Sequence, residues 1–149
     1  MLEQLSDVRT PLRFWLRFIG VEFWLVGLVP FQIGFIVGAQ AWTSTTGLLG
    51  LATVALLTSS SFVLNHICDL ETDRQNPRKA FSLLVRGDLA PLTGWVLFGA
   101  LQLVTLTLAA FVGREFLFCF LGLTTISLAY NIAPLRLKER PGFDIVANG

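Results

Sequence analysis

The sequence predicts an all-α, polytopic membrane helical bundle with about four transmembrane helices. The first observation is composition: of 149 residues, 54% are hydrophobic and 14% are charged, whereas a soluble domain carries roughly 25% charged residues. The second is the length of the uncharged runs, because residues 23–68 and 89–113 carry no formal charge. A membrane-spanning helix needs about 20 apolar residues. Residues 23–68 are therefore long enough for two spans.

Each predicted helix follows from where the polar residues interrupt these runs. A polar, uncharged stretch at residues 40–46 divides the first run, and Arg114 and Glu115 form a polar turn after the second. We treat residues 1–149 as one membrane domain. The predicted spans are residues 21–39, residues 47–64, a helix within 89–113 and a helix within 116–135.

The first 20 residues are amphipathic. Arg9, Arg13 and Arg17 recur every four residues and form one basic stripe, while apolar side chains cover the rest of the helix. We expect this segment to lie at the lipid headgroups with its cations toward anionic lipid.

The charges also predict topology. With four spans, all but one of the eleven Lys and Arg residues fall on the same side, and only Arg114 falls on the other. By the positive-inside rule, the N-terminus, the loop after the second span and the C-terminus are cytoplasmic. We expect a multi-pass protein of the cell (inner) membrane. The net charge of +1 gives no reason to expect a nucleic-acid partner.

The chemistry is concentrated at the end of the second span. Asn65, Asp69 and Asp73 are spaced four residues apart and would share one face of a helix. Two carboxylates and an amide oxygen suit a hard cation such as Mg2+, which completes its coordination with water and substrate phosphate. Glu71 points to another face, and His66 is better explained as a packing or hydrogen-bonding residue than as a ligand. The alternative interpretation of Asp69, Glu71 and Asp73 is that they are the acidic residues of an ordinary solvated helix end, with no bound metal.

Basic residues come closely after the acids: Arg74, Arg78, Lys79 and Arg86. Cations next to a metal site could hold phosphate oxygens. The pattern therefore indicates a Mg-diphosphate site at a membrane surface.

Three motifs resemble the UbiA family of membrane prenyltransferases. The segment from Asn65 to Asp73 is similar to that family's first aspartate-rich motif. Residues 76–79 (Asn-Pro-Arg-Lys) and 87–89 (Gly-Asp-Leu) resemble the family's next conserved segment, and residues 130–138 together with 140–144 resemble the segment that closes the fourth helix. The motifs occur in the family's order and on one predicted membrane face.

The resemblance implies transfer of an isoprenoid chain from an allylic polyprenyl diphosphate to an aromatic or other lipophilic acceptor. Asp69 and Asp73 would bind Mg2+, and Asn65 would support the metal or the diphosphate. Tyr130 would line the cavity near the reacting carbon. Departure of the diphosphate would leave an allylic carbocation. Lys79, with Arg78 and Lys138, would neutralise the negative charge of the leaving diphosphate.

The chain departs from the family in three respects. His66 stands where Asp or Gln is usual, and Ser82-Leu83 stands where many members have Arg-Pro. The family has a second acidic motif in its second half, so the chain reads as an N-terminal half, with a partner half missing, and we expect it to be inactive alone. The rival interpretations are a non-catalytic membrane fragment and a small helical transporter or scaffold, in which the acids would line an ion path.

Overall fold

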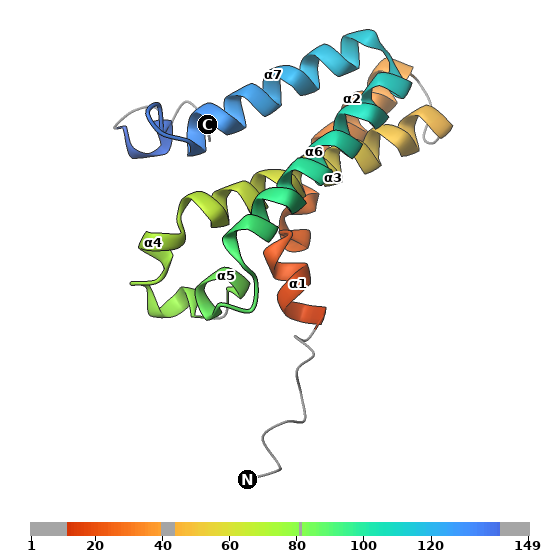
Figure 1. The fold of residues 1–149 in the computed structure, drawn as a ribbon. Coiled ribbons are helices and arrows are strands. Elements are labelled where there is room, and N and C mark those ends of the chain that lie inside the picture. The colour runs from red at the N-terminus through yellow and green to blue at the C-terminus, as the bar shows by residue number, and fades with distance from the viewer. Residues whose placement is uncertain (1–11, 40–43, 81, 141–149) are drawn as a thin grey trace.

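The computed structural model describes residues 12–39, 44–80 and 82–140, and the regular elements of these ranges are helices, with no strand among them (Figure 1). The all-α prediction is confirmed. The elements in order are α1 (Leu12–Phe18), η1 (Val21–Phe23), α2 (Trp24–Ala39), α3 (Thr45–Cys68), α4 (Leu70–Asp73), η2 (Pro77–Lys79), α5 (Leu83–Arg86), α6 (Pro91–Val112), α7 (Arg114–Asn131) and η3 (Leu137–Glu139).

In the described part of the chain, three helical segments are long and apolar enough to cross a membrane: Val21–Gly38, Thr45–Cys68 and Pro91–Val112. The predicted fourth span is also a helix, α7, of 18 residues. It begins with Arg114 and Glu115 and ends with Tyr130 and Asn131, so its apolar part is shorter. Residues 1–11 of the amphipathic segment lie outside the described residues, and its position at the headgroups stays a prediction.

Helix α3 lies at the centre of the bundle, in contact with α2, α6 and α7. Three consecutive serines on α3 each bond a different neighbour, because successive helical residues point about 100° apart. The Trp24 indole of α2 donates to Ser59 Oγ at 2.9 Å, Ser60 donates to Gln102 Oε1 of α6 at 2.9 Å, and Ser127 of α7 donates to Ser61 Oγ at 3.1 Å.

Gln102 extends this polar contact by donating to Thr124 Oγ1 of α7 at 2.8 Å. Between helices in lipid such bonds satisfy polar groups that have no water to pair with. The three helices around α3 are thus fixed in rotation as well as in position.

Glycines allow α2 to approach α3 closely. The Phe35 ring lies over Gly47, and the Phe31 ring lies over Gly50, where an added Cβ would overlap the ring. Phe31 also meets Phe116 of α7 edge to face, with ring centroids 6.0 Å apart. Small residues at helix contacts in membranes favour this kind of packing.

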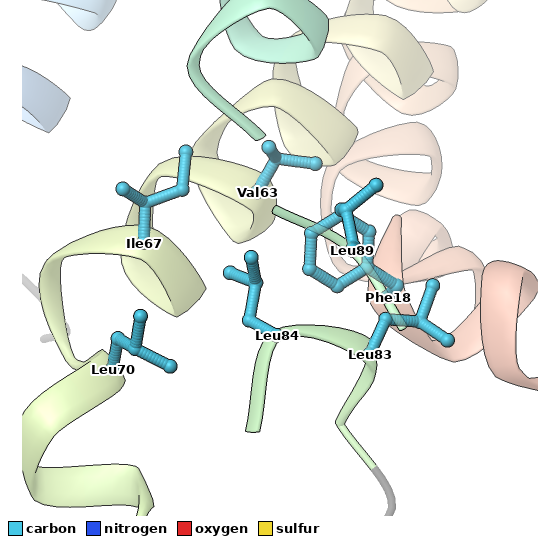
Figure 2. Close-up of a cluster of buried hydrophobic side chains, with 7 residues drawn as sticks. All are labelled: Phe18, Val63, Ile67, Leu70, Leu83, Leu84 and Leu89. Atoms are coloured by element: carbon cyan, nitrogen blue, oxygen red, sulfur yellow. The ribbon is translucent and has the colours of Figure 1, made fainter. Parts of the chain in front are cut away.

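The segment after α3 folds back over the end of that helix. Figure 2 shows the apolar cluster that holds it there. Its members are Phe18 of α1, Val63 and Ile67 of α3, Leu70 of α4, Leu83 and Leu84 of α5, and Leu89. Burying such side chains is worth roughly 1.5–3 kcal/mol each, so residues 69–79 are carried on a packed support.

Candidate functional site

The predicted acidic ladder spans a break between two helices. Helix α3 ends at Cys68, and Asp69, with φ −97° and ψ 4°, joins it to α4. The backbone bonds from Asp69 N to Asn65 O (2.9 Å) and from Asp73 N to Asp69 O (2.7 Å) still keep helical spacing. The four-residue repeat is therefore kept across the break, although the helix is not continuous as predicted.

Two cations from beyond α7 converge on Asp69. Lys138 Nζ lies 2.5 Å from Asp69 Oδ1 and 3.0 Å from Asn65 Oδ1, and Arg136 Nη2 lies 3.2 Å from the same carboxylate oxygen. The chain reaches this point because the backbone turns at Arg136, which has φ 35°, and η3 then brings Lys138 back to the end of α3. The structure thus brings together three residues predicted for the site, Asn65, Asp69 and Lys138.

Asp73 has a different environment. It is buried, with 7% of its surface exposed, and its Oδ2 atom accepts no hydrogen bond from the described residues. Lys79 Nζ lies 3.6 Å away and His66 Nδ1 lies 3.8 Å away. A buried carboxylate oxygen without a hydrogen-bond donor is costly unless a cation or water completes it.

His66 packs rather than extends the ladder. Its ring stacks on Phe18, with centroids 5.3 Å apart and planes inclined by 15°, and only 8% of the residue is exposed. This contact joins α1 to the acidic site. The packing interpretation of His66 agrees with this geometry.

Of the nearby charged residues, Lys79 lies beside the acids, whereas Arg78 and Glu71 do not. Lys79 faces Asp73 from η2, which begins after Asn76, whose side chain accepts from Arg78 N at 3.0 Å. The Arg78 side chain is exposed and is not brought to the acids. Glu71 is also exposed and pairs with Arg74 at 2.8 Å, away from the ladder.

A pocket of about 420 Å³ opens between α3 and α7 beside these groups. Asn65, Tyr130 and Asn131 line its end nearest the charges. Away from them it is mainly apolar. The other lining residues are Leu57, Ser61, Phe62, Leu123, Ile126 and Ser127.

The residues present fit a divalent cation. One ammonium, that of Lys138, touches both Asn65 Oδ1 and Asp69 Oδ1, so these two oxygens already converge on a single positive charge. Asp73 Oδ2 adds an oxygen with no hydrogen-bond donor one helical turn further on. The described residues contain no group of three or more His, Cys, Asp or Glu side chains that could hold a metal. A Mg2+ ion that keeps waters and binds substrate phosphate needs only one or two carboxylates.

The structure adds two residues to the site, Asn131 and Arg136, for which the sequence predicted no individual role. Arg136 binds Asp69, and the buried Asn131 accepts from Lys138 Nζ at 3.1 Å. Both lie in residues 130–138, more than 60 positions after Asn65 and Asp69. Only the folded chain shows the pairing.

The fold and the site together define an α-helical integral membrane protein with paired acidic and basic groups at one end of the bundle, next to an apolar pocket. A model of the UbiA prenyltransferase family matches residues 27–149. The chain therefore belongs to the UbiA prenyltransferase family.

Solved structures agree with this assignment. A UbiA homolog from Archaeoglobus fulgidus bound to DMAPP and Mg2+ matches with a TM-score of 0.80 and 27% identity, covering 90% of this chain and 49% of that one. A second structure shows a UbiA homolog from the same organism bound to GPP and Mg2+. It matches with a TM-score of 0.81 and 27% identity, covering 91% of this chain and 48% of that one. This chain thus spans about half the length of these homologs. No curated protein matches it significantly.

Proposed function

We propose that this chain carries the diphosphate-binding end and part of the prenyl pocket of a Mg2+-dependent intramembrane prenyltransferase. The observation that carries the proposal is the convergence of Asn65, Asp69 and Lys138 at the mouth of an apolar pocket. A prenyl diphosphate has the matching shape, with a highly charged head and an apolar tail. The UbiA homologs from Archaeoglobus fulgidus were solved with DMAPP or GPP and Mg2+, which supports the same substrate class here.

The head of the substrate would lie between two cationic arms. Lys79 stands beside Asp73, while Lys138 and Arg136 stand beside Asp69, so positive charge is available on both sides of the carboxylates. Such charges stabilise negative charge that accumulates on a departing diphosphate. Bound Mg2+, held by Asp69 and Asp73 with support from Asn65, would add Lewis-acid neutralisation of the diphosphate oxygens. Arg78 would contribute only if its exposed side chain turned toward the substrate.

The tail would occupy the pocket between α3 and α7. Tyr130 and Asn65 lie where the charged end meets the apolar lining, which is where the carbon bonded to the diphosphate would sit. Leu57, Leu123 and Ile126 line the pocket and would exclude water from an electron-poor allylic carbon. The acceptor is proposed to be an aromatic or other lipophilic molecule that enters from the lipid.

We further propose that the charged end faces the cytoplasm across the cell (inner) membrane. The structure gathers α1, the loop after α3 and the residues after α7 through Phe18–His66 and Lys138–Asp69 contacts. The positive-inside rule applied to the cations of these segments supports the cytoplasmic assignment.

Binding of GPP in the presence of Mg2+ tests the proposal directly. Asp69→Asn and Asp73→Asn should each weaken binding by more than about tenfold, since even partners outside a metal's ligand shell are worth 10- to 100-fold. Glu71→Gln is the matched control, because Glu71 lies on the same segment but faces solvent. Absence of Mg-dependent GPP binding by the unaltered chain, or equal losses in all three variants, would contradict the proposal and favour a scaffold or ion path.

A further inference from the structure

Asn65 and Asp69 share a cation from the chain itself, the ammonium of Lys138. This ammonium lies 3.0 Å from Asn65 Oδ1 and 2.5 Å from Asp69 Oδ1. Mg2+ binds oxygen at about 2.1 Å. A metal ion that bound both oxygens from the side where Lys138 lies would therefore need the space that its Nζ occupies.

The ammonium is fully satisfied where it lies. An ammonium has three N–H donors, and a third acceptor, Asn131 Oδ1, lies 3.1 Å from Nζ. Asn131 is itself fixed, because it is 4% exposed and its Nδ2 donates to the carbonyl of Ser127 at 3.0 Å. The Lys138 side chain is only 12% exposed. The ammonium therefore has an acceptor for each of its N–H donors at a position that is largely buried.

We propose that Lys138 is the resting counter-ion of Asp69, held there by a further hydrogen bond to Asn65, and that it makes metal binding depend on the diphosphate. The inference rests on the proposed function. Metal alone would have to displace a satisfied ammonium and leave it beside a dication. Metal arriving with diphosphate brings new anionic oxygens, to which the ammonium can turn on its flexible four-carbon stem. Lys138 then exchanges a carboxylate partner for a phosphate partner while the metal takes its place.

Arg136 and Asn131 fit the same exchange. Arg136 also contacts Asp69, and its Nε lies 3.0 Å from Glu139 Oε1 as an ion pair without hydrogen-bond geometry, so a second cation stays beside the carboxylate when Lys138 turns away. Asn131 is a positioning residue: it holds the ammonium at the end of α7, beside the pocket. The exchange needs no movement of the helices, only a change of the Lys138 rotamer.

The test measures Mn2+ retained by the full 149-residue chain in lipid nanodiscs, with and without inorganic pyrophosphate. The unaltered chain should bind Mn2+ at least about tenfold more tightly when pyrophosphate is present. Lys138→Met should raise the affinity for Mn2+ alone by about tenfold, because one adjacent positive charge is removed. Arg140→Gln is the control: it removes a charge from the same tail, but Arg140 is exposed and donates only to the Pro134 carbonyl in the described structure. That variant should stay within about twofold of the unaltered chain.

Lys138→Gln, which keeps hydrogen-bonding groups without charge, gives the same comparison if Lys138→Met does not fold. Equal affinity for Mn2+ alone in the unaltered chain and the uncharged variant would overturn the inference while leaving the proposed function intact. Absence of Mn2+ binding with pyrophosphate in every chain would overturn both.

Discussion

The two aspartates of the ladder should differ sharply in what they contribute to stability. Asp69 receives charged contacts from Lys138 and Arg136, whereas Asp73 Oδ2 accepts no hydrogen bond in the described structure. The perturbation is Asp69→Asn compared with Asp73→Asn, which keeps side-chain shape and removes one negative charge at each position. Both changes should impair Mg-dependent binding, but only the first should weaken the fold.

The magnitudes come from the contacts. Hydrogen bonds to charged groups contribute about 1.5–3 kcal/mol each, and charge assistance accounts for roughly half of that. Asp69, Lys138 and Arg136 are 21%, 12% and 30% exposed, so solvent screening favours the low end. Losing the charge-assisted half of two such bonds at this low end means that Asp69→Asn should lower the free energy of unfolding by about 1.5 kcal/mol.

Asp73→Asn should change the same free energy by less than about 0.5 kcal/mol, or raise it. Its ion pair with Lys79, 3.6 Å long, involves a lysine that is 32% exposed, and such pairs are worth roughly 0.2–1 kcal/mol. Removing a buried charge that lacks a hydrogen-bond donor offsets that loss.

The assay is reversible unfolding in mixed micelles, monitored by helical circular dichroism without Mg2+ or diphosphate. Glu71→Gln provides the baseline, because that side chain is exposed and pairs with Arg74 at the surface. A loss at Asp73 equal to that at Asp69 would refute the reasoning, since it would mean that Asp73 already has partners equivalent to those of Asp69.

Three further predictions concern the bundle, its orientation and its activity. Gln102→Leu breaks two interhelical hydrogen bonds and should lower the free energy of unfolding by about 1.2 kcal/mol, at roughly 0.6 kcal/mol per bond in membranes. A double-mutant cycle with Ser60→Ala measures the coupling between the two side chains, and additive effects would count against the network. Single cysteines replacing Gly87 and Ser44 should be labelled from the cytoplasmic and the opposite side respectively, and labelling of position 87 from outside the cell would reverse the topology. The purified 149-residue chain should show no prenyl transfer, because its described acids hold only one side of a diphosphate; turnover that Asp69→Ala abolishes would show that one motif suffices.

The residue pattern alone was enough to predict the approximate positions of the four long helices, α2, α3, α6 and α7. Charge-free runs decide where helices can cross lipid, because an unpaired charge or backbone group in hydrocarbon is costly wherever the chain later packs. The same local logic placed Asn65, Asp69 and Asp73 on one face, since i, i+4 spacing is a property of the helix itself. It also set Glu71 apart from them, and in the structure Glu71 pairs with Arg74 at the surface.

Only the tertiary structure decided which side chains meet. Lys138 lies 69 positions after Asp69, and the three serines at residues 59–61 each find a partner on a different helix. Neither pairing has a local signal, because it depends on the rotation of α3 against its neighbours and on the turn at Arg136. The unequal surroundings of Asp69 and Asp73 arise in the same way. These two aspartates, four residues apart, differ because the tail after α7 returns to Asp69, while Lys79 and His66 lie beside Asp73.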